Sequence, residues 1–124
     1  VWALNDDDSL SEKARKLILD PDNVIYYSTV FVWEVMLKHA RRPGNIPFDE
    51  VDFSEGCKEA GFVPLGLLDR HILAVRTLKR PADCKAHNDP FDRLLLAQAK
   101  EEKLSFLTHD ALIPDYGERC IIPV

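Results

Sequence analysis

The chain contains the run His87-Asn88-Asp89-Pro90-Phe91-Asp92-Arg93, which opens the segment Leu94-Leu95-Leu96-Ala97-Gln98-Ala99-Lys100. Asp89 followed by Pro90 is typical of a helix N-cap with proline in the first turn. Asp92 then occupies the third helical position, where a carboxylate lies near unpaired N–H groups and the positive end of the helix dipole. The following segment is apolar around most of its circumference, which indicates a central helix. Capping alone explains these polar residues, so a functional role for Asp92 needs support from the rest of the chain.

The remaining segments alternate between helix and strand patterns. Helices are expected over 10–19 with Ser9 as the N-cap, over 30–40 after Ser28 or Thr29, over 53–60, over 69–80 and over 90–103. Strands are expected over 24–28, 62–65, 104–108 and 120–124, with a helical turn over 111–115. Such alternation is typical of a three-layer α/β/α sandwich with a mostly parallel sheet. We therefore predict one domain of this α/β class over residues 1–124.

The composition is that of an ordinary globular domain, with 46% hydrophobic and 30% charged residues. No apolar run is long enough to span a membrane. The three cysteines lie far apart without a Cys-x-x-Cys pair, which disfavours a zinc site or a disulfide framework and favours a reducing cytoplasm. The net charge of −5 disfavours a nonspecific nucleic-acid binder. Basic residues over 38–42 and 76–85 would still contact phosphates if the fold brought them to one rim.

Three carboxylates fall where an α/β sheet positions ligands, beyond the carboxyl ends of its strands. Glu34 lies in the helix after the 24–28 strand, Asp110 follows the 104–108 strand, and Asp92 lies at a helix start. Three converging acids need a cation, and carboxylates with water suit Mg²⁺ or Mn²⁺. The reaction most often attached to such a site is metal-assisted phosphodiester hydrolysis.

Each of these residues also has a purely structural interpretation. Glu34 would be exposed and paired with Lys38 four residues later. Asp110 would cap the next helical turn, and Thr108 would be present for its strand propensity. The four histidines are scattered, and we expect them to be solvated or structural rather than ligands. Residue pattern alone therefore predicts an α/β domain with a candidate metal site.

The chain resembles the PIN-domain family, in particular the VapC-like toxins of bacterial toxin–antitoxin pairs. The resemblance is carried by Trp2-Ala3-Leu4, by 28–38 with Trp33-Glu34-Val35 at its centre, by 87–98 and by 106–110. It implies a metal-dependent endoribonuclease that cuts structured RNA, often tRNA or rRNA. It also implies neutralisation by a cognate antitoxin protein and a homodimer, with no membrane partner.

The resemblance also implies roles for single residues. The family's second, third and fourth acids match the expected catalytic residues and ligands of Mg²⁺ or Mn²⁺, namely Glu34, Asp92 and Asp110. Thr108 and Asp89 are expected to support the site. Lys38 and Arg93 are expected to contact substrate phosphates.

The family's first acid, at the end of a central first strand, lies ahead of the segment that matches Trp2-Ala3-Leu4 and is absent from this sequence. We expect that strand to precede Val1 in the native protein, and enzyme activity depends on it. The alternative is a PIN-like binding module without turnover, which pairs with an antitoxin or with itself. A third interpretation, a phosphoacceptor domain built on the same acids, is disfavoured because no lysine follows a late strand.

Overall fold

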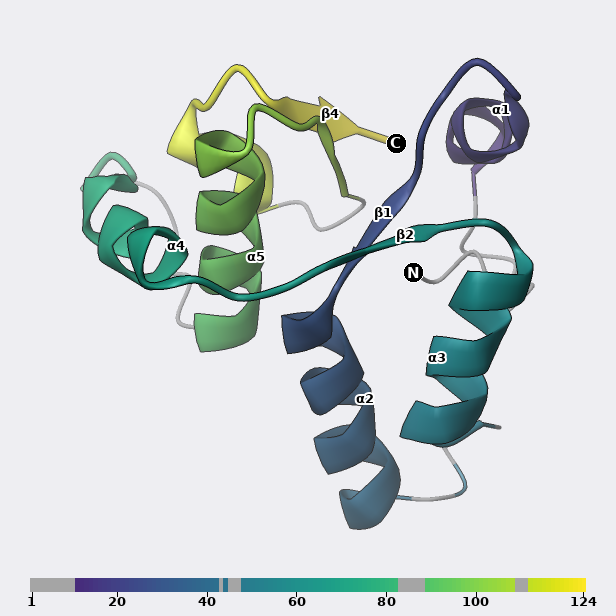
Figure 1. The fold of residues 1–124 in the computed structure, drawn as a ribbon. Helices are drawn as coiled ribbons and strands as arrows, with labels where there is room; N and C mark the ends of the chain where they lie inside the picture. Colours follow the sequence, from purple (N-terminus) through teal and green to yellow (C-terminus); the bar gives the residue numbers. More distant parts are fainter. Residues whose placement is uncertain (1–10, 43, 45–47, 83–88, 109–111) are drawn as a thin grey trace. The chain divides into compact units, whose positions relative to one another are not determined.

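The structure is a computed structural model of the chain, and it describes all residues except 1–10, 43, 45–47, 83–88 and 109–111 (Figure 1). The chain forms two compact units, Val1–Gly66 and Leu67–Val124, and each is described by itself. Among the described residues, no helix is both long and apolar enough to cross a membrane.

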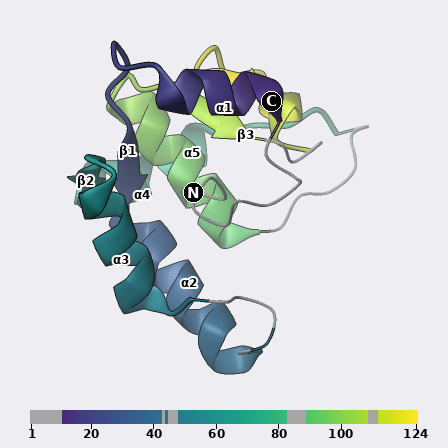
Figure 2. The same cartoon turned by 90° about the vertical axis from the view of Figure 1, so that its right-hand side faces the viewer.

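The described residues of the first unit form a parallel strand pair and three α-helices. Its elements are α1 (Glu12–Leu19), β1 (Tyr26–Ser28), α2 (Thr29–Arg41), α3 (Glu50–Glu59) and β2 (Val63–Leu65). β1 and β2 pair in parallel, with Tyr27 opposite Pro64. Figure 1 and Figure 2 both show α2 and α3 side by side.

Phe53 of α3 is the centre of this unit's core. It is 1% exposed, and its ring contacts Tyr27 edge-on, with 6.3 Å between the ring centroids. Phe31 and Phe48 lie 5.3 and 6.1 Å from it by the same measure. Burial of these aromatic side chains stabilises the packing of α2 against α3 and of α3 against β1.

The described residues of the second unit form two α-helices, two 3₁₀ turns and a second parallel strand pair. Its elements are α4 (Asp69–Ala74), η3 (Val75–Thr77), α5 (Pro90–Glu101), β3 (Phe106–Thr108), η4 (Ile113–Tyr116) and β4 (Ile121–Pro123). β3 and β4 pair in parallel, with Phe106 opposite Ile121. α4 packs against α5 (Figure 1), over a core that includes Leu78, Leu96, Ala97 and Ile113. Helices that alternate with parallel strands confirm the predicted α/β class.

Two predicted helix starts were wrong, and local capping explains both. α1 begins after Ser11 rather than Ser9, because the Ser11 hydroxyl accepts the N–H of Ala14 at 3.1 Å. α3 begins at Glu50, three residues before the predicted start. There Asp49 and Asp52 form a reciprocal capping box, in which each carboxylate accepts the other's backbone N–H.

The predicted 69–80 helix is shorter, and it buries a histidine while two of its apolar side chains stay exposed. The α-helix ends at Ala74 and continues as the 3₁₀ turn η3, where the Thr77 hydroxyl donates to the Ala74 carbonyl at 2.6 Å. The apolar Ile72 and Leu73 are half exposed or more, while His71 is fully buried. The imidazole faces inward because both ring nitrogens find partners there, the N–H of Leu68 at 3.0 Å and the Glu102 carboxylate at 2.6 Å.

Candidate functional site

Asp89 and Asp92 meet at the N-terminus of α5, in the second unit. Asp89 is the N-cap, and its carboxylate accepts the N–H groups of Phe91 at 2.9 Å and Asp92 at 3.3 Å. Pro90 occupies the first turn, as predicted. One carboxylate oxygen of Asp89 and one of Asp92 lie within 4.8 Å of each other, and Asp92 is half-buried. The helix terminus therefore presents two neighbouring carboxylates at the positive end of the helix dipole.

Glu34 and Lys38 meet on α2, in the first unit. Ser28 caps this helix by accepting the N–H of Val30 at 3.1 Å, as predicted. Glu34 is 4% exposed, and its Oε2 lies 3.2 Å from the ammonium Nζ of Lys38. The structural interpretation of Glu34 is therefore partly right: the pair with Lys38 exists, but the carboxylate is buried rather than exposed. A buried carboxylate requires a cation or hydrogen-bond donors, and here a lysine supplies the charge.

Thr108 ends strand β3 and is 5% exposed. Its backbone carbonyl accepts the N–H of Val124 at 2.8 Å, which extends the pairing of β3 with β4 by one bond. Asp110, the third predicted ligand, lies two residues further on and outside the described residues.

Arg93 follows Asp92 on α5 and is half-buried. Its backbone N–H donates to the Asp89 carbonyl at 3.2 Å, as the first helical bond of α5 requires. Its side-chain Nε is buried without a hydrogen-bond partner in the part of the chain that the structure describes. A buried donor of this kind is costly, and an acceptor such as a phosphate oxygen would satisfy it.

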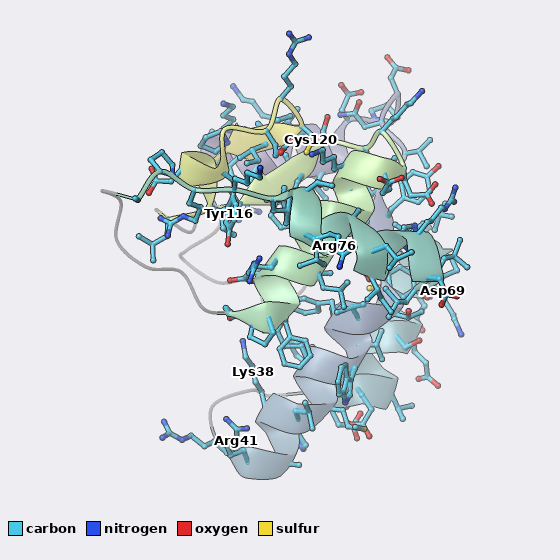
Figure 3. The ribbon with its side chains drawn as sticks, turned by 90° about the vertical axis from the view of Figure 1, so that its left-hand side faces the viewer. Lys38, Arg41, Asp69, Arg76, Tyr116 and Cys120 are labelled. Carbon is cyan, nitrogen blue, oxygen red and sulfur yellow. The ribbon has the colours of Figure 1, made fainter. Side chains whose placement is uncertain are left out.

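Part of the basic stretch over 76–85 has a structural role that sequence reasoning missed. The guanidinium Nη2 of Arg80 lies 2.7 Å from Asp115 Oδ2, and its carbon Cζ lies 5.4 Å from the centre of the Tyr116 ring. Arg80 therefore stabilises η4 through an ion pair and a cation–π contact. Arg76 and Lys79 are exposed (Figure 3 labels Arg76 and Tyr116), and Lys85 lies outside the described residues.

The two described cysteines are poor ligands and poor nucleophiles. Burial raises the pKa of the Cys57 thiol to about 11. Burial, followed by the charge of Glu118, raises the pKa of the Cys120 thiol as well. Because the thiolate is the form that binds metal and attacks electrophiles, both cysteines act as small apolar side chains.

A family model described as the PIN domain matches residues 1–118. The chain belongs to the PIN domain family. Comparison with curated proteins and with solved structures gave no match. PIN domains are in general nucleases that use divalent metal ions.

The carboxylates of this PIN domain fit a hard divalent ion. Mg²⁺ binds oxygen at about 2.0–2.1 Å in octahedral geometry, so two of its ligand oxygens lie about 3–4 Å apart. The Asp89 and Asp92 oxygens lie within 4.8 Å of each other. A small rotation of either side chain is enough to bring them to the separation of about 3–4 Å between two oxygens bound to one Mg²⁺ ion. The donors are carboxylates, and carboxylate oxygens are the ligands that suit oxygen-preferring divalent ions such as Mg²⁺ or Mn²⁺.

Proposed function

We propose that this PIN domain is an Mg²⁺- or Mn²⁺-dependent endoribonuclease and the toxin of a toxin–antitoxin pair. The observation that carries the proposal is the Asp89–Asp92 carboxylate pair, set at a capped helix N-terminus within a chain that matches the PIN model over 1–118. The fold class and the buried acid on α2 support the same activity.

In this proposal Glu34, Asp92 and Asp110 hold the ion, directly or through water. When bound, the ion supplies a polarised water and offsets the negative charge that develops on the scissile phosphate. Asp89 fixes the first turn of α5 and so limits the rotamers from which Asp92 can bind. Thr108, buried at the end of β3, supports the segment that leads to Asp110.

Substrate binding is assigned to cations near the proposed ligands. Arg93 has a buried Nε directed to no described acceptor, and Lys38 has a largely exposed side chain. Both would contact RNA phosphates. The resemblance to VapC-like toxins adds a structured RNA as substrate, a cognate antitoxin as partner, a homodimer and a single PIN domain as the functional unit.

The alternative is a PIN-like module that binds an antitoxin or a second copy without turnover. One observation favours it: the buried carboxylate of Glu34 already has a cation, the ammonium of Lys38 at 3.2 Å. The two functions differ in metal dependence, because only the nuclease requires Mg²⁺ or Mn²⁺.

The test compares Asp92→Asn with Asp52→Asn in protein expressed from the complete native reading frame. The two aspartates are matched, because Asp52 also stands three residues after an aspartate N-cap, in the capping box of α3. We expect Asp92→Asn to reduce Mn²⁺-dependent cleavage of a structured RNA by at least about 10²-fold. Asp52→Asn should cleave like the unchanged protein. Equal cleavage by both variants, with native circular dichroism, would refute the role of Asp92 and favour the module.

A further inference from the structure

The ion pair on α2 joins two side chains in opposite environments. The side chain of Glu34 is 5% exposed, whereas that of Lys38 is 59% exposed, although Nζ and Oε2 are only 3.2 Å apart. The carboxylate is almost fully shielded from water, so it requires a cation or hydrogen-bond donors where it stands, and Lys38 supplies the cation. The lysine loses little by leaving, because most of its side chain is already solvated and its ammonium is strongly hydrated.

A second cation, Arg41, lies close to Lys38 on the same helix. Arg41 lies one turn further along α2 and is exposed, and both side chains extend from the same side of the helix (Figure 3). Their charges repel each other when no anion is near, which favours the Glu34 contact for Lys38. A phosphate group would reverse that preference, because it binds both cations.

We infer that Lys38 is a place-holder cation for the metal. It neutralises Glu34 in the metal-free protein, and a divalent ion displaces it from that carboxylate. The inference rests on the proposed function, because it takes Glu34 to be a metal ligand. The displaced ammonium then lies beside Arg41, where it contacts substrate phosphate, so metal loading and RNA binding are coupled through one side chain.

Two cations cannot share Oε2 at bonding distance without repulsion, so Lys38 and the metal compete. If Lys38 competes with the metal, its removal should change metal affinity in the opposite direction to removal of a metal ligand or of a residue that supports one. Removing the ammonium should tighten metal binding in the absence of RNA, whereas removing a group that holds Glu34 in place would weaken it.

The experiment measures Mn²⁺ affinity by isothermal titration calorimetry for the unchanged protein, Lys38→Met and Lys58→Met, without RNA. Lys58 is the matched control, because it is an exposed lysine on α3 of the same unit and its loss changes the net charge equally. We expect Lys38→Met to bind Mn²⁺ about threefold to tenfold more tightly than Lys58→Met. Equal or weaker binding by folded Lys38→Met overturns the place-holder role.

Two further variants separate the outcomes. Lys38→Gln, which keeps a hydrogen-bond donor for Glu34, replaces Lys38→Met if the methionine variant does not fold, and the same tightening is expected. Glu34→Gln should lose most Mn²⁺ affinity. Unchanged binding by Glu34→Gln removes Glu34 from the ligand set and overturns the inference while leaving the Asp92 test intact. Absence of Mn²⁺ binding by the unchanged protein refutes the metal site and the inference together.

Discussion

Asp89 serves as a cap and also carries a charge beside Asp92, and the two roles make different predictions. Asp89→Ala removes acceptors for two N–H groups, at 2.9 and 3.3 Å. Loss of an N-cap costs about 1 kcal/mol, which corresponds to a fall in Tm of about 3–6 °C for a domain of this size. Asp89→Ser keeps a cap acceptor but removes the charge, so its stability should stay within about 0.3 kcal/mol of the unchanged protein.

The matched control is Asp49→Ala, which removes the N-cap of α3, a helix that carries none of the proposed ligands. Asp49→Ala and Asp89→Ala should lose similar stability in urea denaturation. Activity at a temperature where all variants are folded should separate them, because only Asp89→Ala frees the rotamers of Asp92. We expect about a tenfold loss of Mn²⁺-dependent RNA cleavage for Asp89→Ala and none for Asp49→Ala.

Asp89→Ser then decides how Asp89 acts. Cleavage restored to the unchanged level means that Asp89 acts through the cap, and cleavage as low as in Asp89→Ala means that its carboxylate is itself required. The reasoning is refuted if Asp49→Ala and Asp89→Ala lose activity equally, because both losses would then follow from destabilisation alone.

Two further predictions concern the cores. The hydrogen bond from His71, and after it the charge of Arg70, holds the pKa of the Glu102 carboxyl below its usual 4.5. Since the folded pKa is the lower one, the stabilisation is complete above about pH 4.5 and is lost as pH falls. The urea midpoint of the unchanged protein should therefore fall more steeply on acidification than that of Glu102→Gln, and parallel curves would contradict this. Cys57, whose pKa is about 11, should resist iodoacetamide at pH 8 until urea unfolds the protein, as peptide mass spectrometry would show.

The sequence predicted the strongest helices because their signals are local. Ser28 and Asp89 are caps next to clear apolar patterns, and both helices begin where those residues predict. The pattern Asp-x-x-Asp occurs at Asp49 and again at Asp89, and the first copy is a plain capping box. The local pattern therefore identifies where each helix starts. Only the match to the PIN family model separates the copy at Asp89, a candidate metal site, from the capping box at Asp49.

The buried polar residues were harder to predict, because their environment depends on distant partners. His71 is buried through Glu102, 31 residues later, and no periodicity in the α4 segment indicates that pairing. Glu34 and Lys38 show the opposite case, in which the spacing predicts the ion pair but not the burial of one partner. Burial is set by packing of the unit, which a four-residue spacing does not encode.

The strand pairs also bear on the order in which the chain folds. Tyr26 pairs with Val63, so β1 and β2 close a loop from position 26 to position 63, whereas β3 and β4 close only the loop from 106 to 121. Closing the longer loop costs about 0.8 kcal/mol more in chain entropy, and parallel pairs gain no stability until the loop is closed. During synthesis β1 leaves the ribosome before β2. Until β2 has been synthesised, β1 has no pairing partner, and Tyr26 and Tyr27 are exposed to solvent. The β3–β4 pair forms soon after its residues emerge, so we expect the end of the chain to acquire its sheet faster than the beginning.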